Sequence, residues 1–151
     1  MNIIKTMLLA AVPLMEQKGA IPLGIYKYGL SPMTAFIVTL IGSFLPVPFV
    51  LILFNSIFAF MKKHEVFDPL NKFIERKIEK GSKNMEKYKE LGLIIFIGIP
   101  LPTTGLWTGS AIASFLKLDF KKSIVCALIG GTISGTIITF ISVYFPHMLG
   151  Y

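Results

Sequence analysis

The chain has 151 residues, of which 54% are hydrophobic and 15% are charged, and its mean hydropathy is +0.71. This composition excludes an ordinary soluble domain and is typical of a polytopic membrane protein. The formal net charge of +7 does not indicate a nucleic-acid-binding protein, because nine of the fifteen Lys and Arg residues lie between Lys62 and Lys89. Such clustering is typical of a cytoplasmic loop. We therefore expect one multi-pass domain in the cell membrane, residues 1–151, with the 62–90 loop in the cytoplasm.

The first apolar segment, residues 3–15, superficially resembles a signal peptide. Pro13 and Glu16 interrupt it and no cleavage pattern follows, so we treat it as part of the mature protein. The stretch EQKGAIP, residues 16–22, is predicted to be a break that ends this segment. A short apolar return follows at residues 23–28.

Ser31 and Pro32 have the form of an N-cap followed by proline at the first helical position, so a helix is expected to begin there. The run 33–61 has no formal charge and exceeds the ~20 residues that a spanning helix needs. It is predicted to cross the membrane. Pro46 and Pro48 are expected to kink or interrupt it near its middle.

Residues 62–90 change to a basic, amphipathic pattern. Asp68 and Pro69 form a second cap-and-proline start, and Gly81 stands where a C-terminal cap is expected. The predicted element is an amphipathic helix. Two interpretations stay open: it lies on anionic headgroups, or it is a solvated cytoplasmic connector.

The second half contains PLPTTGLWTG, residues 100–109, in the middle of the apolar run 91–116. Its two prolines remove backbone donors and its two glycines weaken a helix, so the stretch is predicted to be a break. Non-helical backbone at membrane depth must be buried in protein or line a wet cavity, which makes this break a candidate site.

The last apolar run, residues 123–145, is predicted to span the membrane, with Asp119 as the N-cap of its helix. Gly131 and Gly135 are four residues apart within it. This spacing lets neighbouring helices approach closely.

Two short matches indicate an internal repeat. Residues 12–14 and 99–101 read VPL and IPL at an offset of 87, and residues 40–42 and 128–130 both read LIG at an offset of 88. The chain is therefore predicted to contain a duplicated unit. Half 1 covers residues 1–61 and half 2 covers residues 91–151.

Charge separates two ways of threading these halves. If both broken segments cross the membrane, Lys117, Lys121 and Lys122 face outside and the C-terminus lies inside. If the broken segments return as re-entrant hairpins, these lysines stay on the side of the loop, in agreement with the positive-inside rule, and the C-terminus lies outside. We favour the second threading. It predicts an all-α integral membrane protein built as an inverted repeat of a re-entrant helical hairpin plus a transmembrane helix, a layout that places binding sites near the midplane.

Glu16 and Lys18 are charges inside an apolar segment. An ionisable group at the centre of a spanning helix costs about 2.5 to 3.5 kcal/mol on insertion scales, so it needs a partner, a cavity or a role. In extended backbone, residues two apart point to one side, so the two side chains are expected to pair or to face a common cavity. A purely structural ion pair is the alternative. As a site, Glu16 would couple to protons and Lys18 would attract an anionic group, assisted by free N–H groups at the breaks.

Together, EQKGAIP and PLPTTGLWTG resemble the motifs of the small multidrug export protein family, and the resemblance covers essentially the whole chain. That family is similar to the DedA superfamily of membrane proteins, which implies paired re-entrant hairpins and flipping or scrambling of lipid phosphates. Lys18 stands where the family pattern has arginine, and Thr103 stands where it has glycine. Lysine keeps the charge but lacks the planar fork that grips phosphate.

We therefore expect a proton-linked membrane transporter or lipid flippase for a small or lipid-borne anionic substrate, with membrane lipids as partners. The alternatives are a small multidrug exporter of cations that uses Glu16, and a structural or assembly protein without transport activity. The expected substrate or proton-coupling residues are Glu16, Lys18, Gly19, Pro22, Pro100, Pro102, Thr103, Thr104, Gly105, Trp107, Thr108 and Gly109.

An enzyme is not expected, because His64 and His147 lie outside the spans and no nucleophile stands beside a base. No metal, cofactor or nucleic acid is expected either. Two hairpins with only two full spans make a thin shell around a transport path, and a homodimer would thicken it.

Overall fold

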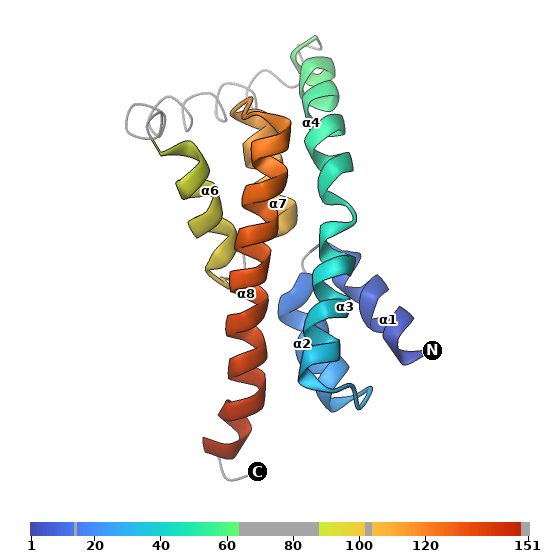
Figure 1. Ribbon diagram of the computed structural model, residues 1–151. Coiled ribbons are helices and arrows are strands. Elements are labelled where there is room, and N and C mark those ends of the chain that lie inside the picture. Colours follow the sequence, from blue (N-terminus) through green and yellow to red (C-terminus); the bar gives the residue numbers. More distant parts are fainter. Residues whose placement is uncertain (14, 64–87, 102–103, 149–151) are drawn as a thin grey trace.

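A computed structural model of the protein describes residues 1–13, 15–63, 88–101 and 104–148. These parts of the chain are helical and contain no strand, so the all-α class is confirmed for them (Figure 1). The elements are α1 (Asn2–Ala11), α2 (Glu16–Tyr26), α3 (Pro32–Phe44), α4 (Val47–Lys62), α6 (Lys89–Gly98), α7 (Leu106–Phe115) and α8 (Phe120–Met148). The amphipathic helix predicted within 62–90, from Asp68 to Gly81, lies outside the described residues.

Two segments are long and apolar enough to cross a membrane. Pro32–Phe54 has a mean hydropathy of 2.5 and Phe120–Phe145 has a mean hydropathy of 2.1. The first of these includes the interruption predicted from Pro46 and Pro48, because α3 ends at Phe44 and α4 begins at Val47. Large apolar side chains such as Phe140 are exposed on these segments, as expected where a helix faces lipid.

The helix starts follow the caps read from the sequence. The Thr34 N–H donates to Ser31 Oγ at 3.2 Å, with Pro32 in the first turn of α3. The Lys122 N–H donates to Asp119 Oδ1 at 3.0 Å, at the start of α8. Both predicted N-caps are confirmed, because each satisfies a backbone donor that the first helical turn leaves free.

The chain turns back after α1 and again after α6. Val12, which ends α1, has φ −78° and ψ 132°, and Ile99, which ends α6, has φ −80° and ψ 118°. Proline follows each of them, and a residue before proline is driven from the helical to the extended region. In Figure 1, α1 with α2 and α6 with α7 form two helical hairpins whose turns lie near the middle of the molecule.

Each hairpin begins and ends at one end of the molecule. Asn2 Nδ2, at the start of α1, donates to the Tyr28 carbonyl at 3.2 Å, just after α2. Lys122 Nζ, at the start of α8, lies 3.0 Å from Glu90 Oε1, at the start of α6. The first hairpin therefore starts where α3 starts, and the second starts where α8 starts.

These two ends are far apart along α8. The Tyr26 hydroxyl donates to the Ser142 carbonyl, which places the open end of the first hairpin beside the C-terminal part of α8. Lys122 marks the other end of that helix, and an α-helical rise from Lys122 to Ser142 covers about 30 Å, close to the thickness of a bilayer's hydrocarbon core. The two hairpins consequently point toward each other from opposite ends (Figure 1).

Glycines let the hairpins pack closely on the long helices. A Cβ on Gly42 would collide with the Met7 carbonyl of α1, and one on Gly130 would lie 3.0 Å from the Ile94 carbonyl of α6. The close packing predicted for α8 is confirmed at Gly131, where a Cβ would lie 3.2 Å from Leu106, and at Gly135, where it would lie 2.8 Å from Phe36. Beside these contacts lies the apolar core: Val47, Leu51, Leu93, Ile97, Leu106, Ala113, Cys126 and Ala127.

Candidate functional site

The first break lies earlier than predicted. α1 ends at Ala11 and α2 begins at Glu16, so residues 16–22, which we expected to be non-helical, belong to α2, Pro22 included. Glu, Gln and Lys are good helix formers, and buried backbone groups in an apolar setting must pair within their own segment. These two effects outweigh the cost of the one backbone hydrogen bond that Pro22 removes. The helix therefore includes Glu16, Lys18, Gly19 and Pro22.

The second break is shorter than predicted. α6 ends at Gly98 and α7 begins at Leu106, so Trp107, Thr108 and Gly109 belong to the first turn of α7. Gly105 is the N-cap of that helix, so the glycine ends the break instead of lying inside it. Pro102 and Thr103 lie outside the described residues.

Glu16 reaches from the first half to the start of α7. Its side chain is 6% exposed, and its Oε1 accepts a hydrogen bond from the Trp107 N–H at 2.9 Å. A helix N-terminus has free N–H groups and a partial positive charge, so a carboxylate is stabilised there. Gly105 makes this approach possible, because a Cβ at that position would collide with the Glu16 carboxylate and its φ of 156° is rarely adopted by other residues.

Lys18 reaches the other side of the same break. Its Nζ donates to the Leu101 carbonyl, three residues after the end of α6. A cation near the C-terminal end of a helix is favoured by the helix dipole. The two charges of the EQK stretch thus lie at the two ends of the break in the second half, an acid at the positive end and a base at the negative end.

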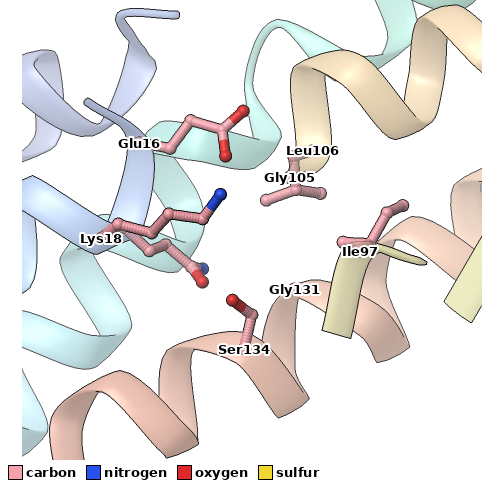
Figure 2. Close-up of a pocket in the computed structure, with 8 residues that line it drawn as sticks. Glu16, Lys18, Ile97, Gly105, Leu106, Gly131 and Ser134 are labelled. Carbon is pink, nitrogen blue, oxygen red and sulfur yellow. The ribbon is translucent and has the colours of Figure 1, made fainter. Parts of the chain in front are cut away.

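The direct Glu16–Lys18 pair is not what holds these charges. Glu16 has a positive φ of 41°, so its side chain departs from the regular helical direction and lies on the same side as Lys18. Figure 2 shows the carboxylate and the amine both directed toward Gly105 and the start of α7. Both side chains line one closed pocket instead of an open cavity, and each charge has its own partner in the second half.

Trp107 makes the return contact to the first half. Its Nε1 donates to the carbonyl of Ala11, the last residue of α1, at 3.1 Å. Within the second break, Thr104 Oγ1 donates to the Ile99 carbonyl at 2.6 Å and accepts from the Leu101 N–H at 3.1 Å. The Leu101 N–H also donates to the Ile99 carbonyl at 2.8 Å, so Thr104 adds hydrogen bonds to a tight backbone turn around Pro100.

The remaining predicted residues are not part of the pocket. A Cβ on Gly109 would meet Ile97, which makes Gly109 a packing residue between α7 and α6. Thr108 is exposed. Gly19 contacts the side chain of Met15, and Pro22 continues α2 away from the break.

The pocket itself is lined by Glu16, Gln17, Lys18, Ile97, Gly105, Leu106, Gly131 and Ser134, and it leaves no space for a water molecule (Figure 2). Gly131 and Ser134 lie about halfway between Lys122 and Ser142 along α8. The site is therefore closed, and it lies about halfway along the segment of α8 that matches the membrane thickness.

Gln17 is the residue that the motif analysis did not single out. It is 3% exposed, it lines the pocket, and its Nε2 has no hydrogen-bond partner. Buried amides are normally paired, because an unmet donor in an apolar setting is costly. The sequence signal that could have identified Gln17 is its position between the two charged residues Glu16 and Lys18. Within the described residues, no group of three or more His, Cys, Asp and Glu side chains is arranged to hold a metal ion.

These features define a helical membrane protein with a buried, charged site where two broken helical segments meet. The sequence model of the family described as "Putative small multi-drug export protein" matches residues 16–137. The chain belongs to this family, as the two motifs predicted, and the family's name indicates a role in small multidrug export. No curated protein and no solved structure matches the chain.

Proposed function

We propose that this protein is a membrane transporter or lipid flippase that moves a small or lipid-borne anionic substrate, and that the movement is linked to protonation of Glu16. The observation that carries the proposal is the placement of Glu16 and Lys18. Both are held at the break of the opposite half, about halfway along α8. Glu16 is buried and Lys18 is half-buried, and charges at such a depth mark substrate or proton pathways in membrane proteins.

The proposed threading is the re-entrant one. The 3.0 Å contact between Glu90 and Lys122 supports it, because a segment that starts and ends at one side of the membrane does not cross it. The contact between Asn2 and Tyr28 supports the same arrangement for the first hairpin. A ten-residue helix such as α6 extends about 15 Å, which is half of a ~30 Å hydrocarbon core, so the hairpin turns would meet near the midplane.

The proposed inverted repeat rests on matching contacts in the two halves. Gly42 packs on Met7, and Gly130 packs on Ile94. These pairs are related by the offsets of 88 and 87 that also relate the LIG and VPL/IPL matches. Because the hairpins open at opposite ends of α8, the related halves would be inverted, as in many secondary transporters. The likeness to the DedA superfamily belongs to this proposal.

Anion transport follows from the groups at the site. Lys18 supplies a cation, and the start of α7 supplies backbone N–H groups, which together favour negative charge. The pocket has no free space, so the described conformation is a closed one and transport requires the two breaks to separate. Loss of the negative charge on Glu16 weakens its contact with α7, which favours opening at low pH.

Export of cations is the second candidate, and the family name favours it. A buried carboxylate such as Glu16 would then bind the cation directly. A cage for organic cations is usually built from several aromatic rings. Trp107 contacts Glu16 through its backbone N–H, and its indole N–H is occupied by the Ala11 carbonyl.

The test is transport by the purified protein in liposomes, with three substrates in parallel arms: sulfate, a fluorescent phosphatidylglycerol and the cation ethidium. We expect movement of sulfate or of the anionic lipid, faster at low pH. Lys18→Gln should reduce the rate at least about tenfold. A hydrogen bond from a charged ammonium to the substrate contributes more than ~1.4 kcal/mol, which corresponds to a factor of ten in rate. The matched control is Lys27→Gln, which removes an exposed lysine after the end of α2 and should leave the rate unchanged.

Movement of ethidium alone would support the cation exporter instead. If none of the three substrates moves at any pH, the protein has a structural or assembly role and the proposal is wrong.

A further inference from the structure

We propose that the amino end of α7 is a binding site for a small oxyanion, and that the Glu16 carboxylate is a tethered occupant of that site which the incoming oxyanion replaces. The inference rests on the proposed function and deepens it, because it names the groups that hold the substrate's negative charge. It also states how the proton and the substrate are linked. Protonation of Glu16 frees its place for the substrate, so only one negative group occupies the site at a time.

The contact of Glu16 shows what the site accepts. A carboxylate is itself an oxyanion, and it is held here by the Trp107 N–H at 2.9 Å in the first turn of a ten-residue helix. Gly105 leaves the backbone bare at that point, because any Cβ would occupy the position of the carboxylate oxygens. Bare backbone, free N–H groups and the positive end of a helix are the features by which proteins bind phosphate and sulfate.

Gln17 is an independent sign of a missing ligand. Its Nε2 is a donor without a partner in a side chain that is 3% exposed, and the side chain lines the same pocket. A Cβ on Gly135 would lie 3.0 Å from Gln17 Oε1, so α8 confines this amide closely. Sulfate and phosphate carry more acceptor oxygens than the Glu16 carboxylate, and an additional oxygen would accept a hydrogen bond from this Nε2.

Lys18 supplies the third donor. Its Nζ is bound to the Leu101 carbonyl in the closed site, so it is held beside the pocket. Trp107, Gln17 and Lys18 would thus bind an oxyanion with a backbone amide, a side-chain amide and an ammonium group. No other predicted site residue is needed for this set.

The replacement has to be exclusive, for two reasons. The pocket has no space for even a water molecule while the carboxylate is in place, so an oxyanion fits only after Glu16 moves. Two negative groups at one helix end would also repel each other. Lys18 is the charged group that acts on Glu16 among the described residues, and the pocket residues from α6, α7 and α8 are neutral, namely Ile97, Gly105, Leu106, Gly131 and Ser134.

A protonated Glu16 loses its attraction to the helix end and leaves, and the oxyanion takes the Trp107 N–H. Release of the oxyanion lets Glu16 give up its proton and return. Each bound oxyanion therefore accompanies one proton. No bond is made or broken apart from this proton transfer.

The structure provides a reporter for the test. Trp107 is the only tryptophan of the chain, and its backbone N–H is the group that changes partner. The probe is sulfate, which keeps its charge between about pH 5 and about pH 8, and binding is followed by Trp107 fluorescence in detergent. If Glu16 must be protonated before sulfate binds, the apparent Kd for sulfate rises about tenfold per pH unit in the pH range where Glu16 of the free protein is ionised.

Glu16→Gln copies the protonated acid, so this variant should bind sulfate tightly and equally at every pH. Near pH 8, it should bind at least about tenfold more tightly than the wild type. Glu90→Gln is the matched control. It neutralises an exposed carboxylate that pairs with Lys122 at the surface, away from the pocket, so this variant should keep the wild-type pH dependence. Gln17→Leu should weaken sulfate binding several-fold without changing that dependence.

A parallel arm separates a free oxyanion from a lipid headgroup. The same fluorescence is measured in nanodiscs of phosphatidylcholine with and without phosphatidylglycerol, a lipid whose phosphate keeps one negative charge. A response to phosphatidylglycerol that follows the pH pattern of sulfate assigns the site to headgroups. A response to sulfate alone assigns it to free oxyanions. Either result supports the site.

The proposal is overturned if wild-type binding is independent of pH, or if Glu16→Gln binds sulfate no more tightly than the wild type near pH 8. The wild-type measurement decides the matter even if the variant fails to fold. Sulfate binding with the expected pattern in a protein that transports nothing would overturn the proposed function and keep the site. Transport without this pattern of sulfate binding would support the proposed function and overturn the site.

Discussion

Gly105, in the second half, lies directly against the Glu16 carboxylate of the first half. Gly105→Ala places a Cβ on the Glu16 carboxylate in a backbone conformation with φ 156°, so we expect it to be strongly destabilising. Gly29→Ala is the matched control, because Gly29 has φ 64° with nothing within 4 Å of its added Cβ. The control should cost about 1 to 2 kcal/mol, and Gly105→Ala about 1 to 3 kcal/mol more, because steric overlap is added to backbone strain. Unfolding in detergent measures both.

A second change separates the two contributions. Glu16→Ala removes the side chain that the new Cβ meets, so the double variant should recover the steric part of the loss and keep the backbone part. Strictly additive effects of the two substitutions would show that Glu16 does not lie against Gly105, since residues in contact are expected to be coupled.

Glu16 and Lys18 were identified from the sequence because a charge in an apolar segment is costly and needs an explanation. Their partners were not predictable in the same way. Trp107 and Leu101 lie 91 and 83 residues further along the chain, and no local pattern relates them. Gln17 was missed because an amide between two charges reads as part of a polar turn. Only the packing of α8 shows it to be buried.

At the scale of elements, the contacts of Gly42 and Gly130 hold each hairpin against a long helix. Gly42→Ala should destabilise the protein by about 1 to 3 kcal/mol, because the new methyl group meets the Met7 backbone carbonyl, which cannot rotate away. Gly130→Ala should have a similar effect through Ile97 and the Ile94 carbonyl. Thermal unfolding in detergent gives the comparison.

Gly19→Ala is the control for these two variants. Its Cβ would meet the end of the flexible Met15 side chain, which can move aside, while alanine favours the helix by up to about 1 kcal/mol. Equal stability of all three variants would show that α1 and α6 do not pack on α3 and α8 as described.

The sequence predicted the elements better than their boundaries. Ser31, Asp119 and the Pro46–Pro48 interruption act locally, so the sequence was sufficient to place them. The breaks were misplaced by several residues because both motifs mix residues that interrupt a helix with residues that begin one. Glu16 and Leu106 begin helices, and the true breaks lie before them. The first turn of α7 also depends on a contact from the other half, because its Trp107 N–H donates to Glu16.

For the whole molecule, we predict that the carboxyl ends of α7 and α2 face opposite sides of the membrane. In a background where Cys126, the lone and buried cysteine, is replaced by alanine, Lys117→Cys should react with an impermeant maleimide only after cells are permeabilised. Lys27→Cys is the control and should react in intact cells. The reason is that Lys117 follows α7 on the side of the basic loop and Lys27 follows α2 on the opposite side.

Reaction of Lys117→Cys in intact cells would mean that α6 and α7 together cross the membrane, which the four-span threading requires. The contact between Glu90 and Lys122 would then have to be wrong. The tail beyond residue 148 gives no information on this point, because it lies outside the described residues.

At this scale, composition was enough to predict a helical membrane protein, and two three-residue matches were enough to suggest a repeat. How the halves meet was beyond the sequence. The charges of α2 are complementary to the ends of α6 and α7, and Trp107 returns the contact to α1. This complementarity depends on the three-dimensional placement of helix ends, to which periodicity and composition are insensitive.

The central claim is that proton release from Glu16 controls the site at the start of α7. Its most direct test is the pH profile of sulfate and phosphatidylglycerol movement in liposomes by Glu16→Gln beside the wild type. We expect the wild-type rate to fall as pH rises, because the ionised Glu16 returns to the Trp107 N–H and closes the site. The variant should show a flat profile. A Glu16→Gln protein that folds and keeps the wild-type pH profile would contradict the account.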